Sequence, residues 1–406
     1  MDAVSRTILH LDLDAFFCSV EELRDPALVG KAFAVGGSPD GRGVVSSCSY
    51  SARKFGVRSA MPMAQAVRLC PDLIVVSHGF GGYRDASNKV MDRLRDLSPD
   101  IEQISVDEAF VDISHLNGDP FDIASSLQRR IRDELRLPCS IGIASNKLMA
   151  KIATEVGKSK KPSALARITA NTAEGSSPSA ICVVPRGAEA AFLATLPASM
   201  LWGVGPKTGE KLAELGINTI GDIAALTELE LARRFGEHGR SLWRHAHGID
   251  NREIVTEHVA KSISREETFA RDVRDDTILR KLIRDQARAL SKQLAREGVC
   301  GSVVKIKIRW PDFTTLTRQI SLANPTDAEE TISAMGITLF ERVWSPGRPV
   351  RLLGLGVSGL TTPQQLNLWD MRPAQRAEQD RRIQLALSKV QERIGDGVVK
   401  RASDLK

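Results

Sequence analysis

The stretch that decides the fold is ILHLDLDAFFCSVEE, residues 8–22. Its first half alternates apolar residues with His10, Asp12 and Asp14, which is the period of a β-strand, where side chains two apart share a face. Asp12 and Asp14 are therefore predicted to project together from the end of this strand. Two buried anions side by side are costly without a cation or hydrogen-bond donors. The pair therefore indicates that a cation or a set of donors lies at the strand end.

Length and composition indicate a multidomain protein. The chain has 406 residues, enough for two to four domains, and its 42% hydrophobic content can build sizeable cores. We find no apolar run of about 20 residues, the length needed to span a bilayer. The first residues, MDAVSRTILH, lack the basic and then apolar pattern of a signal peptide. We therefore expect a cytoplasmic protein with no membrane partner.

The cysteines and histidines do not indicate a zinc site or a disulfide framework. The six cysteines form no C-x-x-C pair, so we expect reduced and mostly buried thiols. The one close histidine pair is His245 and His247, for which we favour a structural role.

Positive charge gathers in one part of the chain. The net charge is +6, which permits a polyanionic partner without proving one. Residues 261–360 carry 17 Lys and Arg against 12 Asp and Glu, so this part is net +5.

The predicted secondary structure also divides the chain. The pattern is α/β over the first 165 residues, and from about 185 to 250 it is helical and interrupted by glycines. A helix followed by strands is predicted within 261–360, and a charged tail follows from 361.

A second acidic motif lies in ISVDEAFVDIS, residues 104–114. Asp107 and Glu108 are adjacent, so at the turn of a hairpin both can point toward the end of the strand that carries Asp12. Three converging carboxylates are the hard oxygen ligands that a pair of Mg²⁺ ions requires. A solvated turn and a plain strand terminus remain the alternative for either segment alone.

A third motif, SSCSYSARKFGVRSAMP at residues 46–62, combines a phenol with basic side chains. Tyr50 and Arg53 are one helical turn apart and can grip a triphosphate, for which Arg offers a bidentate fork. An amphipathic helix with a basic, solvated face is the alternative.

In order and spacing, these motifs resemble the signatures of the Y-family translesion DNA polymerases, most closely the bacterial DNA polymerase IV group. The resemblance extends to about residue 360. The segments that carry it are DLDAFF (12–17), SYSARKFGVR (49–58), SVDEAF (105–110), SIGIASNKLMAKIATE (140–155), LWGVGPKTGEKLAELGINTIGDI (201–223), GRSLWRHAHGID (239–250) and VRLLGLGVSGL (350–360).

The resemblance implies an α/β multidomain fold shaped like a right hand. The parts that it implies are a catalytic palm (1–18 and 78–165), fingers (19–77), a helical thumb with a helix-hairpin-helix (166–249), a linker (250–260), an α+β little finger (261–360) and a tail (361–406).

The resemblance also implies the chemistry. Asp12, Asp107, Glu108 and the carbonyl of Leu13 would bind two Mg²⁺ ions, which Mn²⁺ could replace. The enzyme would add deoxynucleotides to a primer 3′ end on a DNA template, with low fidelity and without a proofreading exonuclease. Asp14 is expected to support this site, as a hydrogen-bond acceptor for nearby backbone.

Further residues match the family's contacts with the nucleotide sugar and base. Phe17 matches the aromatic steric gate that leaves no space for a 2′-hydroxyl, with Phe16 beside it; taken alone, core packing is the alternative. Ser46 and Ser47 match the small residues that lie over the nascent base pair.

Tyr50 and Arg53 match the family's triphosphate contacts. A third contact is normally the Lys of a Lys-Pro pair, for which we favour Lys161. The sequence departs from the family here, since EVGKSKKPSAL has extra residues, and Lys158 or Lys160 can take this part.

Two regions are predicted to bind DNA. Gly203, Gly205 and Lys207 resemble a helix-hairpin-helix, in which exposed backbone N–H groups suit a phosphate. In KIKIR, Lys305, Lys307 and Arg309 fall on one strand face, which can follow phosphates; a solvated sheet face is the alternative.

The tail contains QQLNLWD, residues 364–370, which resembles the peptide that docks bacterial polymerases onto the sliding clamp. The anchors that it would supply are Gln365, Leu366, Leu368 and Trp369. Packing of these side chains onto residues 261–360 is the rival interpretation.

Two other classes of function remain to be weighed. A nucleotidyl cyclase shares a palm-like fold and two-metal carboxylates, but it predicts no helix-hairpin-helix, basic second domain or clamp peptide. A catalytically inert relative that binds DNA and recruits repair factors would be expected to have lost a carboxylate, and all three are present. We therefore expect a polymerase that acts as a monomer on primer-template DNA.

Overall fold

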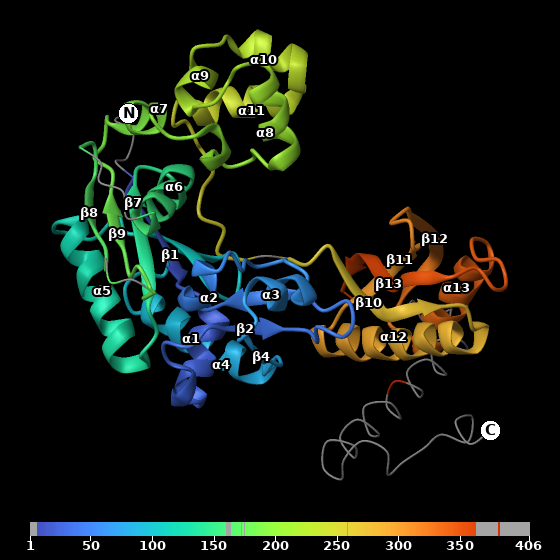
Figure 1. Ribbon diagram of the computed structural model, residues 1–406. Helices are drawn as coiled ribbons and strands as arrows, with labels where there is room; N and C mark the ends of the chain where they lie inside the picture. The colour runs from blue at the N-terminus through green and yellow to red at the C-terminus, as the bar shows by residue number, and fades with distance from the viewer. Residues whose placement is uncertain are drawn as a thin grey trace. The chain divides into compact units, whose positions relative to one another are not determined.

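The computed structural model describes residues 6–159, 164–171, 173, 175–257, 259–362 and 381 (Figure 1). The chain divides into two compact units, one up to residue 258 and the other from residue 259. Each unit is described by itself.

The first unit is built on a six-stranded sheet with strand order β5-β6-β1-β7-β9-β8. The central strand β1 (Ile8–Leu13) pairs antiparallel with β6 (Glu108–Asp112) and with β7 (Cys139–Ala144). The remaining strands are β5 (Ile101–Gln103), β8 (Arg167–Thr169) and β9 (Ile181–Val183), and β9 is parallel to β7.

Both faces of this sheet are covered, which is why every residue of β1 is buried. Leu9 and Leu11 pack in a core shared with α4 (Phe80–Arg95) and α5 (Pro120–Leu135). Ile8, on the opposite face, packs with α6 (Lys147–Lys158). The alternation along β1 therefore places its side chains alternately in two cores. The last residues of β1 lie at the end of the sheet where the two acidic motifs meet.

A smaller three-stranded sheet, with order β3-β2-β4, has its own core. Its strands are β2 (Phe33–Gly36), β3 (Val45–Cys48) and β4 (Ile74–Val76). Helix α1 (Phe16–Arg24) and the 3₁₀ turn η1 (Pro26–Leu28) lead into it, and α2 (Tyr50–Lys54) and α3 (Met63–Leu69) join its strands.

Helices form the last part of the first unit. They are α7 (Glu189–Ala194), the 3₁₀ turn η2 (Ala198–Met200), α8 (Pro206–Glu214), α9 (Ile220–Ala224), α10 (Glu228–Phe235) and α11 (Glu237–Ala246). Leu212, Leu231 and Leu242 lie in the same core cluster as the buried side of α6. Thr219 and Thr227 begin α9 and α10 with capping boxes, which satisfy the free N–H groups at those helix starts.

The second unit is a four-stranded antiparallel sheet with two helices on one face. The strands, in the order β10-β13-β11-β12, are β10 (Ser262–Val273), β13 (Val350–Thr361), β11 (Cys300–Arg309) and β12 (Thr315–Thr326). Ile306 and Ile308 are buried in a core that includes residues of α12 (Asp276–Glu297) and α13 (Glu329–Glu341). The predicted alternation along KIKIR is confirmed, since the basic side chains between these residues are not buried.

Three other expectations concern the chain as a whole. All six cysteines are buried free thiols, as predicted. His245 and His247 hydrogen-bond the backbone carbonyls of Trp202 and Trp243, which is the structural role expected for them. Within the described ranges, no helix is long and apolar enough to cross a membrane.

Candidate active site

The two acidic motifs meet at one end of the six-stranded sheet. The register of β1 and β6 places Asp12 directly opposite Glu108. The N–H of Leu13 donates to the carbonyl of Asp107 at 2.9 Å, so the turn between β5 and β6 is held against the end of β1. Asp12 and the adjacent pair Asp107 and Glu108, which are far apart in the sequence, therefore lie together at the ends of these strands, which we call the acidic edge.

Ser105 holds the turn that carries Asp107. Its Oγ accepts hydrogen bonds from the N–H of Asp107 at 3.1 Å and of Glu108 at 2.9 Å. Its hydroxyl also donates to Asp107 Oδ1. The turn is thus fixed by one serine, which leaves the second carboxylate oxygen of Asp107 for other partners.

Two lysines of α6 face the carboxylates of β1 and β6. Lys158 Nζ lies 2.6 Å from Asp12 Oδ1, and Lys151 Nζ donates to Glu108 Oε2 at 2.8 Å. Residues seven apart on a helix lie on the same face, so α6 presents both ammonium groups together. The sequence alone did not point to these contacts, although the spacing in AKIATEVGK could have suggested them.

Burial and the two lysines act in opposite directions on the carboxylates. Burial raises the pKa of Asp12 to about 8, because its effect exceeds the lowering by Lys158. Burial also favours the neutral form of Glu108, but the hydrogen bond and charge of Lys151 outweigh it and lower the pKa of Glu108. The two lysines therefore only partly compensate the buried negative charge.

The donor set suits a hard divalent cation. Asp12, Asp107 and Glu108 offer carboxylate oxygens and Leu13 a carbonyl, which are the ligand types that Mg²⁺ prefers. Among the residues that the structure describes, no three acidic, imidazole or thiol groups form a preformed metal cluster. The reason is local, since Asp12 and Glu108 are turned toward lysines and Asp107 toward Ser105.

Asp14 lies beneath this edge and is almost fully buried. It accepts hydrogen bonds from the N–H of Ser179 at 3.0 Å, from Ser177 Oγ at 2.7 Å and from Ser140 Oγ at 2.9 Å. The prediction that Asp14 accepts hydrogen bonds from nearby backbone is confirmed. The two serine hydroxyls come from distant parts of the chain and were not foreseen.

The aromatic pair follows β1 at the start of α1. Ala15, with φ 47°, makes the left-handed turn between the strand and the helix. Phe16 is buried in the core, whereas Phe17 is only partly buried and its ring stacks on Tyr83 with the centroids 4.4 Å apart. The Phe17 ring therefore lies at the periphery of the core, packed against Tyr83.

The small residues and the phenol–guanidinium pair lie on β3 and α2. Ser46 Oγ lies 2.6 Å from His78 Nε2, and Ser47 is buried beside it. The guanidinium carbon of Arg53 lies 4.4 Å from the centroid of the Tyr50 ring. Burial raises the pKa of Tyr50, and the negative charge of Asp14 adds to the effect, so the phenol stays neutral.

Three candidate residues compete for the remaining triphosphate contact. Lys160 and Lys161 lie outside the described residues. Lys158 is the last residue of α6 and contacts Asp12, so it is the candidate that the structure brings to the acidic edge.

The helix-hairpin-helix candidates lie at the start of α8. Gly203 has φ +105°, a conformation that favours glycine, and Gly205 precedes the first helical residue, Pro206. A side chain at Gly205 would meet nothing within 4 Å, and Lys207 is exposed, so this helix start is open.

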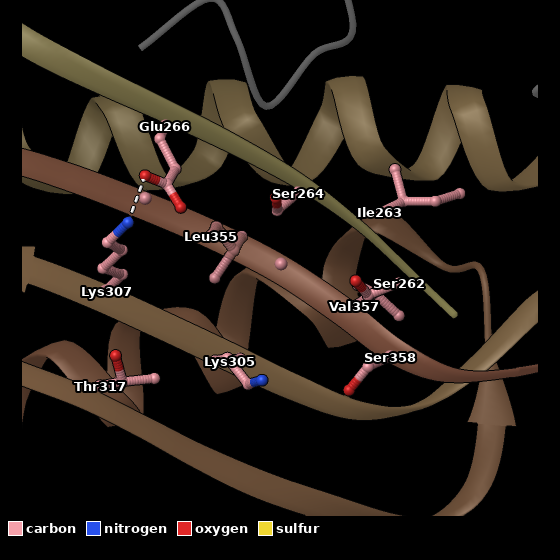
Figure 2. Close-up of a pocket in the computed structure, with 12 residues that line it drawn as sticks. Ser262, Ile263, Ser264, Glu266, Lys305, Lys307, Thr317, Leu355, Val357 and Ser358 are labelled. Atoms are coloured by element: carbon pink, nitrogen blue, oxygen red, sulfur yellow. Dashed lines mark hydrogen bonds and ion pairs between the residues drawn. The ribbon is translucent and has the colours of Figure 1, made fainter. Parts of the chain in front are cut away.

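The basic face of the second unit, formed by Lys305, Lys307 and Arg309 on β11, lies beside a shallow hollow of about 210 Å³ (Figure 2). Lys305 and Lys307 line it from β11, and Glu266 lines it from β10. Lys307 Nζ lies 2.7 Å from Glu266 Oε2, as the dashed line in Figure 2 marks, so one of the basic charges is already paired. Arg309, farther along β11, donates to Thr315 Oγ1 at 2.8 Å.

The clamp-peptide candidates lie outside the described residues; they are Gln365, Leu366, Leu368 and Trp369.

Comparisons with known proteins match nearly the whole chain. Residues 11–155 match the impB/mucB/samB family, residues 260–368 the C-terminal domain of that family, and residues 199–250 the thumb domain of DNA polymerase-iota. A DNA polymerase IV of Dehalococcoides mccartyi is 39% identical over 97% of this chain and 96% of its own length. A DNA polymerase IV of Desulfatibacillum aliphaticivorans is 37% identical over 98% of this chain and 96% of its own length.

A solved structure has the same fold. A Y-family DNA polymerase chimera of Dbh and Dpo4 superposes with a TM-score of 0.74 at 22% identity, over 88% of this chain and 100% of that chain. Together with the family matches, this likeness confirms the predicted right-hand fold of palm, fingers, helix-hairpin-helix thumb and little finger.

Proposed function

Because the chain belongs to the Y-family of DNA polymerases, in the DNA polymerase IV group, it is a DNA-directed DNA polymerase of the translesion class, and we propose that Asp12, Asp107 and Glu108 are its catalytic carboxylates. The observation that carries this proposal is the register that sets Asp12 opposite Glu108, with the Asp107 turn bonded to Leu13. Primer extension by the purified chain, on undamaged and on lesion-bearing templates, tests the proposal.

The same residues would hold the divalent cations. Asp12, Asp107, Glu108 and the Leu13 carbonyl would bind two Mg²⁺ ions, or Mn²⁺ in their place. When bound, the ions would offset the charge of the triphosphate and favour ionisation of the primer 3′-hydroxyl. Lys158 and Lys151 favour ionisation of Asp12 and Glu108 and so partly offset the effect of burial, and Ser105 keeps the Asp107 turn in place.

Residues around this edge would bind the incoming nucleotide. Phe17 would lie against the sugar as the steric gate, and Ser46 and Ser47 would lie over the nascent base pair. Because the Phe16 side chain is buried, its contact with the nucleotide would come from its backbone. Small side chains over the base pair enclose it loosely, which fits low fidelity, and no proofreading exonuclease is expected.

The triphosphate would be held by three side chains. Tyr50 keeps a neutral hydroxyl that can donate a hydrogen bond, and Arg53 stacks on its ring with a fork suited to phosphate. For the third contact, the position of Lys158 beside Asp12 favours this residue, and Lys160 and Lys161 remain candidates on sequence grounds.

We assign the parts of the chain accordingly. The palm is 1–18 and 78–165, the fingers 19–77, the thumb 166–249, the linker 250–260, the little finger 261–360 and the tail 361–406. The match at 199–250 lies within the thumb, and the match at 260–368 and the division between residues 258 and 259 lie close to the start of the little finger. Strands β8 and β9 belong to the same sheet as β1, so the palm extends beyond the sequence-based boundary at 165, at least to residue 183.

Primer-template DNA would meet two surfaces that carry no base-specific groups. One is the open start of α8, where Gly203, Gly205 and Lys207 offer N–H groups and an ammonium to a phosphate. The other is the basic face, formed by Lys305, Lys307 and Arg309. Binding through phosphates alone makes affinity independent of sequence and sensitive to salt.

Neutralising the basic face should therefore weaken DNA binding on every sequence alike. In a variant with Lys305→Gln, Lys307→Gln and Arg309→Gln, we expect the slope of log K against log salt to flatten by about 0.9 for each lost phosphate contact on duplex DNA. Fluorescence anisotropy at several salt concentrations measures the slope. An unchanged slope would mean that these side chains only face solvent.

Two further variants sharpen this measurement. Glu266→Gln removes the carboxylate that pairs with Lys307, so it should strengthen DNA binding and steepen the slope. Arg318 is the matched control, because it pairs with Ile306 and so lies on the helix-covered side of the sheet. We expect Arg318→Gln to leave the slope as it is.

The tail would bind the sliding clamp. Gln365 followed by Leu366, Leu368 and Trp369 has the spacing of an extended docking peptide, and it follows the last strand, which ends at Thr361. A short segment with so few apolar residues cannot build a core of its own, so these side chains would be available to a partner.

Replacing Leu368 and Trp369 with Ala should lower clamp affinity and spare primer extension without the clamp. Truncating buried anchors costs about 2 kcal/mol or more, which corresponds to roughly thirtyfold weaker binding. Calorimetry with the cognate clamp measures this, and Met371→Ala, just outside the peptide, is the control. Equal affinity of variant and parent would refute clamp binding, and a fall in thermal stability would support packing onto residues 261–360.

Two general properties complete the proposal. We expect the enzyme to act in the cytoplasm, where bacterial DNA lies, since the relatives are bacterial polymerases. We expect a monomer, because one chain supplies every residue assigned to the site.

A further inference from the structure

A short chain of contacts joins the Phe17 ring to the Ser46 hydroxyl. Phe17 stacks on Tyr83, with the centroids 4.4 Å apart and the ring planes 26° apart. Tyr83 Oη accepts a hydrogen bond from the N–H of Gly79 at 3.3 Å. The residue before Gly79 is His78, whose Nε2 lies 2.6 Å from Ser46 Oγ. The turn before α4 therefore contacts Tyr83, which stacks on Phe17, and also the Ser46 hydroxyl of β3.

The Tyr83 end of this chain is firmly held. Its ring is buried, and its hydroxyl donates to Glu21 Oε1 at 2.5 Å. Burial raises the pKa of Tyr83 to about 12, so the phenol remains a donor. Arg24 binds the same Glu21 oxygen at 3.1 Å, so α1 also fixes the carboxylate that accepts the hydrogen bond from Tyr83.

The turn before α4 is closed tightly onto α1. At Gly79 and Gly82, an added Cβ would overlap the guanidinium of Arg24. Only glycine lets the backbone come this close without moving Arg24. The first turn of α4 thus lies against the Arg24–Glu21 pair, and Glu21 also binds Tyr83 in that turn.

We propose that Tyr83 and His78 are positioning residues that fix Phe17 and Ser46 relative to each other, so that the sugar and the base pair meet one rigid wall. This inference rests on the proposed roles of Phe17 and Ser46. A gate excludes a 2′-hydroxyl only while its ring cannot shift, and a displacement of about 1 Å in a reacting complex is costly. Tyr83 blocks that shift from behind the ring, and His78 holds the hydroxyl of Ser46 at the other side of the same turn.

Single-nucleotide incorporation kinetics test this inference. In Tyr83→Leu, which removes the stacked ring, the ratio of kcat/KM for dNTP over rNTP should fall on the order of tenfold. Tyr83→Phe keeps the stack and loses the bonds to Glu21 and Gly79, so it should lower the ratio about threefold. In His78→Ala, insertion of a mismatched dNTP should rise about threefold relative to the matched one.

Two control variants distinguish a change at the sugar gate from a general loss of stability. Phe121→Leu alters a buried aromatic residue of the same core cluster on α5, so it should lower thermal stability without changing either ratio. Phe17→Ala reports on the gate itself: if it leaves the sugar ratio unchanged, the proposed role of Phe17 fails. If Phe17→Ala relaxes the ratio and both Tyr83 variants keep the parent value, the inference is overturned for Tyr83. Should Tyr83→Leu not fold, Tyr83→Phe decides alone, and an unchanged mismatch ratio in His78→Ala removes His78 from the assignment.

Discussion

Replacing Asp107 with Ala is expected to slow Mg²⁺-dependent nucleotide addition on the order of a thousandfold or more, because it removes a carboxylate that would hold the cations, and these cations would offset the negative charge of the transferring phosphoryl group. The affinity for primer-template DNA should stay close to that of the parent, because the surfaces assigned to DNA lie elsewhere in the chain. Rapid-quench primer extension and fluorescence anisotropy measure the two quantities.

Isosteric variants guard this test against misfolding. Asp107→Asn keeps an oxygen for Ser105 and loses the charge, so it should be nearly as inactive as Asp107→Ala. Asp112, at the other end of the strand β6 that follows Asp107, is the matched control. Its carboxylate accepts a hydrogen bond from the N–H of Ser114 at 2.9 Å, and Asp112→Asn keeps that acceptor. Full activity of the Asp107 variants would end the assignment.

Replacing Phe17 with Ala should make the enzyme accept ribonucleotides. The ring would no longer fill the space of the 2′-hydroxyl, so the kcat/KM ratio of dNTP over rNTP should fall on the order of a hundredfold. Most of the change should come from faster use of rNTP, with dNTP incorporation lowered less.

Phe192→Leu is the control for the loss of an aromatic ring. Phe192 is buried in a core cluster with residues of α6 and the thumb helices, and its substitution should leave sugar selection unchanged. If Phe17→Ala keeps the parent ratio, Phe17 is a packing residue and the gate lies elsewhere.

Local patterns in the sequence were sufficient to predict the elements that carry the site. The alternation along β1 predicts that Asp12 lies at a strand end, and the adjacent acids of 107 and 108 are consistent with a hairpin turn. The alternation along KIKIR predicts which side of β11 is apolar. Such patterns are read within one element, so no knowledge of distant contacts is needed.

Contacts between distant segments could not be predicted in the same way. Asp14 meets Ser140 and Ser177, which come from β7 and from the turn before β9. Lys158 meets Asp12 because α6 packs against the sheet, and a lysine near a helix end gives no sign of that by itself. The contact of His78 with Ser46 depends in the same way on how the turn before α4 packs against β3.

The sequence also did not predict which charged side chains form ion pairs with each other. Lys307 was expected to present a free charge to phosphate, and the structure pairs it with Glu266 across the sheet. The two residues lie on strands that are separated in the sheet by β13, where Gly354 leaves room between them. Only the strand order explains this contact.

The acidic edge formed by β1 and the turn before β6 should add nucleotides as the template directs and only with a divalent cation. Rapid-quench addition of single nucleotides by the full chain, on templates with each of the four bases, measures both properties together. We expect the complementary dNTP to be added fastest on every template when Mg²⁺ or Mn²⁺ is present, and no addition after chelation. Addition that ignores the template base, or that continues without a divalent cation, would contradict this expectation.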